Sequence, residues 1–360
     1  EALCEANGQD VADLDYLLEN VAIATVADVM DLTEENRILV KQGLEMLKRT
    51  SNLGLRALIQ CIGLEGKKIQ AYHIGFILAP CLNASGKLDT AKRALALLRA
   101  KTEREADMLA GDLKALNESR RDMTDRVVDE AMAKVEQTDI RGDKVLVIYL
   151  PDCHESLAGL VAGRVRENYY RPVFVLTDSE DGVKGSGRSI ESYSMYEELT
   201  GCGDLLTKFG GHPMAAGLSL DKENVEKFKR RLNDQCTLSE EELTEKVVID
   251  MELPFAAITE QFIEELEYME PFGKGNTKPV FAARGVVMQH VKIIGKNKNV
   301  AKATAIDAAG NRMEAICFHD AQEFAERCER NNGKMSITFY PGINEFRGER
   351  QIQIVITHYR

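Results

Sequence analysis

The spacing of hydrophobic positions is helical over one long stretch of the chain, residues 101–137. Its apolar members recur at intervals of three, four and seven, and most positions between them are charged or polar. This spacing puts the apolar side chains on one face of a helix. No proline interrupts the stretch. It therefore predicts a single helix of about 55 Å, at 1.5 Å per residue, which suits a strut between two domains. The apolar positions are Leu109, Leu113, Leu116, Met123, Val127 and Ala131.

The region before the long helix contains apolar runs of two kinds. The short run Val21–Val26 predicts a buried strand that ends before Asp28. An aspartate just past a buried strand lies where α/β proteins gather their site residues, and capping of the next turn is the structural alternative for it. The longer patterns predict helices over 33–49, 54–63 and 75–98, with a polar turn at 83–87 inside the last stretch.

After the long helix, apolar runs and helical patterns alternate. Runs at 144–150 and 171–177 flank a helical pattern at 155–170. This order predicts two parallel strands joined by a right-handed crossover. We then expect, in chain order, a strand over 183–190, another strand after two adjacent glycines, a helix over 222–234 and an acidic linker over 239–246.

The last part of the chain changes to short alternating runs separated by turns. They predict about five strands, most of them preceded by one helix at 258–269. Five strands in roughly 110 residues fit a small barrel of the OB type, which binds single-stranded nucleic acid on its face, and another small β-barrel is the alternative. The expected strands lie within 246–253, 279–294, 299–318, 334–346 and 350–359.

Composition and charge narrow the class of function. The 360 residues suffice for two or three domains, and no apolar run reaches the ~18 residues of a membrane span. The net charge of −12 argues against a whole surface that binds nucleic acid. However, Pro271–Arg360 carries 14 Lys and Arg against 8 Asp and Glu, a net of +6, which leaves −18 for the rest. This asymmetry favours a basic end that meets a polyanion, with a basic face that has no partner as the alternative. Eight cysteines without a C-x-x-C spacing indicate reduced thiols.

Three short motifs carry residues suited to phosphate. Gly210–Gly211 would let a phosphate approach the backbone closely beside His212, a hydrogen-bond donor; a tight turn into a packed strand is the structural alternative. Arg188 offers a planar fork to phosphate oxygens, with Ser186 on the same strand face. His154 lies at the start of a predicted helix, where anions are favoured, or is a turn residue without a role in catalysis.

These motifs, with three others, resemble those of one family, the RecJ single-stranded-DNA-specific 5′→3′ exonucleases of the DHH phosphoesterase superfamily. The similarity runs over essentially the whole chain, and six motifs in the family's order make it specific. Two resemble the end of the catalytic domain, three the DHH-associated domain, and the last the segment that leads into an OB domain. They are ATVADVMDL with ENRILVKQGL, LAPCLNASGKLDTA, HESLAGLVAGRV, GSGRS, GGHPMAAG and MEPFGKGNTKPVF.

The resemblance implies an α/β multidomain architecture in four parts. The C-terminal part of a DHH catalytic domain is expected in 1–99 and a connecting helix in 100–137. A DHH-associated α/β domain is expected in 138–238, and an OB-type β-barrel that binds nucleic acid in 239–360.

The resemblance also implies roles for single residues. Asp28 matches a carboxylate that helps bind the catalytic divalent pair, Mn²⁺ or Mg²⁺, hard ions that prefer oxygen ligands. Ser186 and Arg188 match residues that recognise the DNA 5′-phosphate. His212, held by Gly210–Gly211, matches the motif that faces the scissile phosphate in two-metal cleavage.

Further residues are expected along the DNA strand. Asn83 and Lys87 lie near the DNA path by resemblance, and Cys81 stands where many members have arginine, which puts a basic contact there in doubt. His154 is included among the DNA-binding residues. In the predicted barrel, no acid occurs between Pro271 and Ile306. The basic residues expected to contact the strand there are Lys292, Lys296 and Lys298, and Lys302 lies in the same window. The aromatic residues nearby, on which bases could stack, are Phe281, Phe318, Tyr340, Phe346 and Tyr359.

One departure from the family concerns the metal site. The sequence has no Asp-His-His triplet and lacks the earlier motifs that supply most metal ligands. We therefore expect the C-terminal portion of a longer exonuclease, with an incomplete two-metal site and no activity of its own. The alternatives are another DHH phosphodiesterase, acting on oligoribonucleotides or cyclic dinucleotides, and a non-catalytic single-strand-binding module. The expected setting is a cytoplasmic monomer in DNA repair and recombination. Its expected partners are single-stranded DNA with a 5′ end, a single-strand-binding protein and a helicase, and no membrane.

Overall fold

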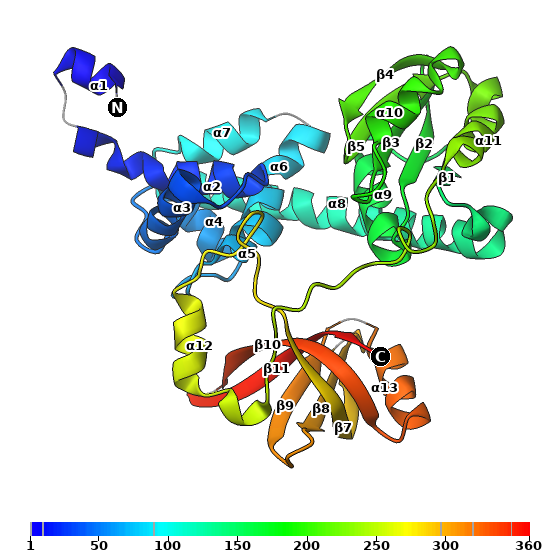
Figure 1. The fold of residues 1–360 in the computed structure, drawn as a ribbon. Coiled ribbons are helices and arrows are strands. Elements are labelled where there is room, and N and C mark those ends of the chain that lie inside the picture. The colour runs from blue at the N-terminus through cyan, green and yellow to red at the C-terminus, as the bar shows by residue number, and fades with distance from the viewer. Residues whose placement is uncertain (1, 9–10, 89–90, 296, 319, 347) are drawn as a thin grey trace. The chain divides into compact units, whose positions relative to one another are not determined.

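The computed structural model describes every residue except 1, 9–10, 89–90, 296, 319 and 347, and it describes no side chain at 2–3, 11–13, 85–88 or 346 (Figure 1). Contacts between residues group the chain into two compact units. The barrel unit comprises residues 1–50, 64–79 and 247–360, and the sheet unit comprises residues 51–63 and 80–246. Segments distant in sequence therefore share each unit.

The N-terminal part of the barrel unit is helical. Its elements are α1 (Ala2–Asn7), the 3₁₀ helix η1 (Val11–Leu17), α2 (Leu18–Ala27), α3 (Glu34–Leu47), α5 (Ala71–His73) and the π-helical turn η2 (Ile74–Leu78). Helices α2 and α3 pack closely, because a Cβ placed on Gly43 would lie 2.5 Å from the Cβ of Ala22. The predicted strand over Val21–Val26 is therefore wrong: this run belongs to a helix whose small residues face another helix.

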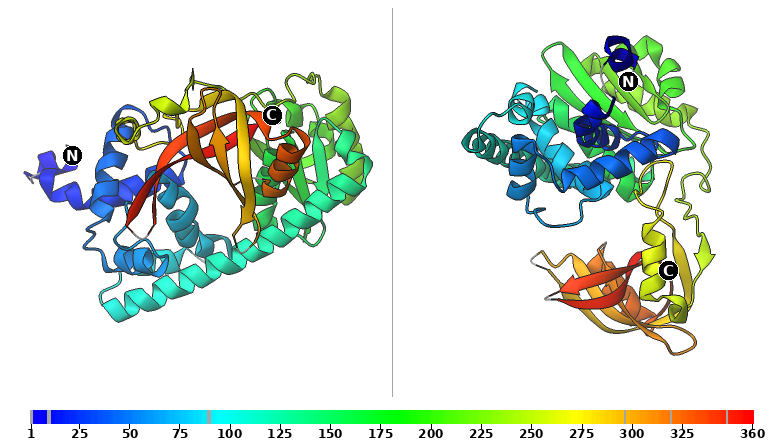
Figure 2. Two further views of the ribbon diagram at one scale, coloured as in Figure 1. Left: turned by 90° about the horizontal axis from the view of Figure 1, so that it is seen from below. Right: turned by 90° about the vertical axis from the view of Figure 1, so that its left-hand side faces the viewer.

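The C-terminal part of the barrel unit is a closed five-stranded barrel (Figure 1, Figure 2). Its strands are β7 (Phe281–Ile294), β8 (Val300–Ile306), β9 (Arg312–Cys317), β10 (Lys334–Phe346) and β11 (Glu349–Tyr359). They are ordered β10-β11-β9-β8-β7, and β10 also pairs with β7, which closes the barrel. Alternate residues point inward, so Ala301, Ala303 and Ala305 of β8 are buried with Phe339 of β10 in one core.

The predicted OB-type architecture is confirmed, with a different partition of strands. The expected first strand contributes only β6 (Met251–Glu252), which pairs with β7, while the expected single segment 299–318 folds as the two strands β8 and β9. The helix expected at 258–269 is α12 (Glu260–Glu267), which follows the 3₁₀ turn η6 (Phe255–Ala257). A helix that the sequence analysis did not predict, α13 (Ala321–Arg330), lies between β9 and β10.

The sheet unit contains a five-stranded sheet with helices on both faces. Its strands are β1 (Leu146–Tyr149), β2 (Val173–Ser179), β3 (Gly182–Arg188), β4 (Leu206–His212) and β5 (Ala215–Leu220), in the order β1-β2-β3-β5-β4. The pair β1–β2 is parallel, as predicted, and the other pairs are antiparallel. One face packs on α9 (Glu155–Tyr169) and the other on α10 (Met195–Thr200) and α11 (Val225–Gln235). Short 3₁₀ turns are η3 (Asp139–Gly142), η4 (Gly203–Leu205) and η5 (Lys222–Asn224).

The predicted long helix is confirmed as α8 (Glu103–Gln137), with 35 residues. Its first turn is capped by the Thr102 hydroxyl, and Glu103 pairs with Arg56 of α4 (Leu53–Cys61) at 2.8 Å. Its last turns bury Ala131 and Val135 against α9. The other helices near its start are α6 (Ala79–Leu88) and α7 (Lys92–Leu98).

The polar turn expected at 83–87 is wrong, because this segment lies within α6. Ala84 is completely buried there. Alanine is the best helix former and serine is intermediate, so small residues by themselves do not indicate a turn. No helix in the described part of the chain is both long enough and apolar enough to cross a membrane.

Candidate phosphate-binding face and nucleic-acid interface

Three neighbouring strands of the sheet unit align polar residues in rows. Directly opposed residues of antiparallel strands point to the same face, and so do residues two apart along a strand. The register across β3, β5 and β4 gives three such rows on one face. They are Arg188–Ala215–His212, Ser186–Gly217–Gly210 and Lys184–Ser219–Lys208. We call these nine residues the open sheet face.

The middle strand makes this face a trough. Ala215, Gly217 and Ser219 carry small or no side chains, so the longer residues of β3 and β4 rise on either side of them. A groove of about 500 Å³ lies over the second and third rows, beside the row of Arg188, and is bounded on one side by the first turn of α9, at Glu155 and Ser156. The trough is thus open to solvent and wide enough for a phosphate group.

Arg188 lies at the edge of the trough with donors to spare. Its Nη1 donates to the carbonyl oxygen of Gly187 at 2.8 Å, and no carboxylate in the described part of the chain pairs with it. Burial, and then the charge of Arg166, lower the pKa of the guanidinium. The side chain fits against α9 at Gly159, where a Cβ would lie 2.7 Å from its Nη2. A desolvated cation with unused donors favours an anionic ligand.

The two adjacent glycines differ in their surroundings. Gly211 has φ of 152°, and a Cβ there would lie 2.4 Å from the Ala215 carbonyl oxygen. A Cβ on Gly210 would meet nothing within 4 Å. Gly211 is therefore required by the packing of β4 on β5, whereas Gly210 leaves open space in the trough. The structural alternative, a tight turn, therefore fits Gly211, while the close approach of a phosphate at Gly210 stays a prediction.

The two histidines expected near phosphate are both exposed. His212 ends β4, and the turn after it is fixed from both sides, because the carbonyl oxygens of Pro213 and Met214 accept from the amides of Met195 and Ser189. His154 caps α9: its Nδ1 accepts from the Ser156 amide at 3.3 Å. The cap uses one nitrogen of the His154 ring, while His212 stays in the row with Arg188.

Sequence reasoning missed the third row. Lys184 pairs with Glu155 at 2.6 Å, and Lys208 is exposed on the other side of the trough. Both lie two residues from a predicted site residue on the same strand. Side chains two residues apart on a strand point to the same face, and this spacing could have identified both lysines from the sequence.

The described residues do not fit a two-metal centre. Asp28 is exposed and forms the C-cap of α2, so it follows a helix rather than the strand that was expected. Among the residues that the structure describes, no group of three or more His, Cys, Asp or Glu side chains could hold a metal ion. We therefore derive no catalytic step through a metal from these residues.

The residues expected along the DNA path lie on α6. Asn83 is exposed, whereas the side chain of Lys87 lies outside the described ones. Cys81 is only 2% exposed, and burial raises the pKa of its thiol to about 11. It is a core residue of the sheet unit, so it supplies no surface contact in place of the family's arginine.

The lysines of the barrel differ in whether a carboxylate pairs with them. Lys292 and Lys298 are exposed, and Lys296 lies outside the described residues. Lys302 is opposite Lys292 in the β7–β8 register but pairs with Glu314 at 2.8 Å. Among the aromatics named for stacking, Phe318 is exposed, Phe281 is in the core, and Tyr340 and Tyr359 pack against it. The side chain of Phe346 is not described.

Comparisons with known proteins agree with this architecture. Residues 142–238 match the model of the DHHA1 domain, and residues 249–358 match that of the RecJ OB domain. The single-stranded-DNA-specific exonuclease RecJ of Bacillus subtilis is 36% identical over 95% of this chain and 44% of its own length. RecJ of Escherichia coli is 32% identical over 96% of this chain and 61% of its own length. The crystal structure of Thermus thermophilus RecJ in complex with Mg²⁺ matches the whole chain and 54% of its own chain, with a TM-score of 0.82 and 26% identity.

The chain thus combines an α/β sheet domain of the DHH-associated type with an OB barrel that follows it. As its motifs predicted, its homologues over most of its length are RecJ single-stranded-DNA-specific exonucleases, and it spans about half the length of the curated relatives it matches. Thermus RecJ has been crystallised with Mg²⁺ and with Mn²⁺.

Proposed function

We propose that the chain is part of a single-stranded-DNA exonuclease that works from the 5′ end, and that the open sheet face binds the 5′-terminal phosphate. The observation that carries the proposal is the row Arg188–Ala215–His212. In this row, the guanidinium of Arg188 and the side chain of His212 lie on opposite sides of the small residue Ala215. No carboxylate among the described residues pairs with that guanidinium. Neighbouring strands lie about 4.8 Å apart, so the two ends of the row are about 10 Å apart, enough to span adjacent phosphates of one strand.

The roles within the row follow from the chemistry of each group. Arg188 and Ser186 donate hydrogen bonds to the terminal phosphate, and Gly210 admits the strand close to the backbone. His212 faces the next phosphate, the one to be cleaved. The barrel holds the strand further along through Lys292 and Lys298. The RecJ OB match over residues 249–358 favours a DNA exonuclease over the oligoribonucleotide and cyclic-dinucleotide alternatives. On the family resemblance alone, we propose a cytoplasmic setting, a monomeric state and a role in repair and recombination. On the same ground we propose a single-strand-binding protein and a helicase as partners.

Substitution of Arg188 tests the 5′-phosphate role. Arg188→Ala should weaken binding of a 5′-phosphorylated oligothymidylate by about tenfold or more, because a hydrogen bond to a charged group contributes about 1.5–3 kcal/mol. Binding of the same strand with a 5′-hydroxyl should change little. Fluorescence anisotropy with both strands measures the difference. Arg164→Ala is the matched control, an exposed arginine on α9, the helix against which Arg188 packs. Equal losses for the two strands would remove Arg188 from end recognition.

For the 360-residue polypeptide by itself we propose binding without turnover. The support is the lack of a ligand cluster among the described residues. Incubation with 5′-phosphorylated single-stranded DNA and Mn²⁺ should release no nucleotides above a metal-free control. Sustained, chelator-sensitive release by the purified polypeptide would contradict this proposal and would call for a metal site outside the described residues.

A further inference from the structure

Two aromatic side chains of the barrel unit stack on each other while both remain in solvent. The ring centroids of Tyr72 and Phe76 are 4.9 Å apart with the planes at 27°. The two residues are 60% and 72% exposed. Phe76 lies in the π-helical turn η2, and such turns occur frequently at functional sites. A stacked, exposed pair offers a flat apolar surface that water solvates poorly.

This pair forms part of a groove of about 600 Å³ within the barrel unit. Val29 and Met30, just after α2, add two more exposed apolar side chains to its lining. The loop 272–278 contributes five further lining residues, two of them lysines. That loop is held firmly, because the Leu32 amide donates to the Lys274 carbonyl oxygen at 2.6 Å and the Lys274 ammonium pairs with Asp31 at 2.9 Å.

The charge of the groove has one sign. Of the described residues that line it, Lys274 and Lys278 are the charged ones, and none is acidic. The Lys278 ammonium lies 3.8 Å from the centroid of the Tyr340 ring and 5.9 Å from that of Phe272. Burial lowers the pKa of Lys278, and Glu270 opposes this shift. An apolar aromatic surface with a cationic edge matches a nucleotide, which joins a flat base to a phosphate.

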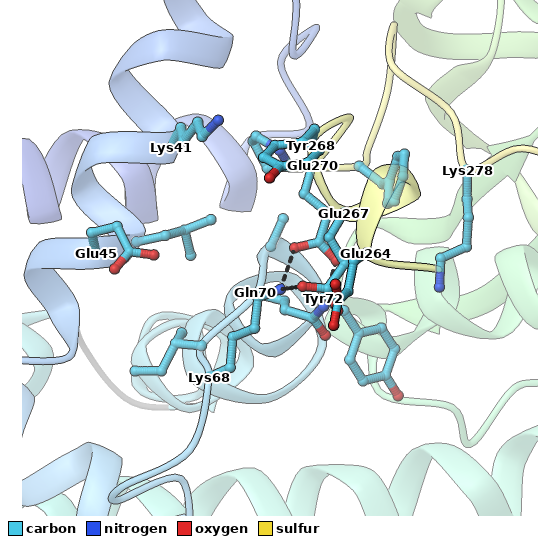
Figure 3. Close-up of a pocket in the computed structure, with 15 residues that line it drawn as sticks. Lys41, Glu45, Lys68, Gln70, Tyr72, Glu264, Glu267, Tyr268, Glu270 and Lys278 are labelled. Carbon is cyan, nitrogen blue, oxygen red and sulfur yellow. Dashed lines mark hydrogen bonds and ion pairs between the residues drawn. The ribbon is translucent and has the colours of Figure 1, made fainter. Parts of the chain in front are cut away.

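The neighbouring pocket shows where the strand would not go. It shares Tyr72 and Lys278 with the groove, but its other wall is acidic (Figure 3). Glu267 and Glu270 both pair with Lys68, at 2.7 and 3.1 Å, and Glu270 also accepts from Gln70 at 2.7 Å. Lys68 on that side is thus already engaged by two carboxylates, and Lys41 shares the lining of the pocket with four glutamates. A phosphate is therefore favoured on the side of Tyr72 that faces Phe76.

We propose that this groove binds one or two nucleotides of single-stranded DNA, with bases stacked on Tyr72 and Phe76 and a phosphate near Lys278. The inference rests on the proposed function, binding of single-stranded DNA, and adds a third contact to the open sheet face and the barrel. Charge favours this occupant over a protein segment, because the lining has no acids and Lys278 has no ion pair with a carboxylate among the described residues, whereas Lys274 is already paired with Asp31. A second copy of the chain, with a net charge of −12, is the competing occupant that the experiment must separate.

A tryptophan reporter tests base stacking directly. The chain has no tryptophan, so Phe76→Trp creates a single indole in the groove. Its fluorescence should be quenched, in a saturable manner, by an oligothymidylate. An abasic strand of equal length, which has the phosphates but no bases, should not quench it. Quenching by neither strand, under conditions in which the oligothymidylate is bound, would overturn the proposal.

Alanine variants of the unmodified chain separate the possible outcomes. Tyr72→Ala and Phe76→Ala should each weaken binding of the oligothymidylate by about tenfold, the usual order for one lost stacking contact. Tyr16→Ala, which removes an equally exposed tyrosine outside the groove, should bind as the unmodified chain does, and circular dichroism verifies that all variants are folded.

Each remaining outcome has a distinct meaning. Failure of the unmodified chain to bind single-stranded DNA would overturn both the proposed function and this inference. Normal binding by the unmodified chain and equally tight binding by both groove variants would overturn the inference alone. A dimer in light scattering that becomes monomeric in Phe76→Ala, without a change in DNA binding, would assign the groove to a second copy instead.

Discussion

At the residue scale, Gly210 and Gly211 separate structure from function within one motif. Gly211 combines a positive φ with a neighbouring carbonyl oxygen that leaves no room for a Cβ, whereas Gly210 faces open space. A side chain is thus excluded at one position by the fold and at the other, on our proposal, by the ligand. The pair therefore provides a matched test in which the same substitution should have different effects.

Gly211→Ala should destabilise the protein, and Gly210→Ala should not. Strained backbone conformations cost about 1–3 kcal/mol for a residue other than glycine, and the clash with Ala215 adds to this cost. Melting of the Gly211→Ala variant, followed by circular dichroism, should occur several degrees lower, at about 2–4 °C per kcal/mol. Gly210→Ala should melt normally and bind the phosphorylated strand more weakly. Equal melting temperatures for both variants would contradict this division of roles.

The sequence predicted the residues of the open sheet face that share a short motif. Ser186 and Arg188 lie two apart on one strand, so their common orientation follows from local geometry alone. The position of Gly159 against Arg188 could not be predicted, because it depends on how α9 packs on β3. For Asp28, by contrast, the sequence correctly predicted that the residue follows the end of an element. It predicted a strand there, whereas the structure has a helix.

At the scale of elements, errors arose where short apolar runs have no clear period. Val21–Val26 has the composition of a buried strand, yet it packs as a helix on Gly43. Periodicity alone cannot distinguish a buried strand from a buried helix in so short a run. The long helix α8 was predicted well because its apolar positions repeat over many turns. Helix α13 was missed because it lies within a run of strands, where its few apolar positions resemble those of a loop.

The contact between α9 and β3 gives a prediction at this scale. A Cβ on Gly159 would lie 2.7 Å from Nη2 of Arg188, the far end of a flexible side chain. Gly159→Ala should therefore displace the guanidinium and leave the backbone in place. Discrimination between 5′-phosphate and 5′-hydroxyl strands should fall several-fold, while the melting temperature stays nearly unchanged, since alanine is the better helix former.

Gly163→Ala is the control for that substitution. Gly163 is on the same helix, and a Cβ there would meet nothing within 4 Å. This variant should keep the full discrimination between the two strands. If Gly159→Ala also kept it, Arg188 would bind phosphate in an orientation other than the one seen against α9, or not at all.

At the scale of the whole molecule, charge is concentrated rather than spread. The acidic majority of the chain would repel DNA, so binding depends on a few local groups of cations. The structure reduces the number available in the barrel: Lys302 is engaged by Glu314, while Lys292 and Lys298 remain exposed. The sequence could show that this window is basic, but not which of its lysines are already paired with an acid from another strand.

The salt dependence of binding should report these two lysines. For single strands, the logarithm of affinity falls by about 0.7 per logarithmic unit of salt for each phosphate neutralised. Replacing both Lys292 and Lys298 by alanine should therefore reduce the slope for an oligothymidylate by about 1.4 on the same rule. Lys302→Ala should reduce it by less, because releasing Glu314 offsets part of the loss. Lys227→Ala, an exposed lysine on α11, should leave the slope unchanged. Titrations of the whole chain at several salt concentrations measure all three variants beside the unmodified chain. A double variant with the unaltered slope would mean that the strand does not follow the barrel's basic window.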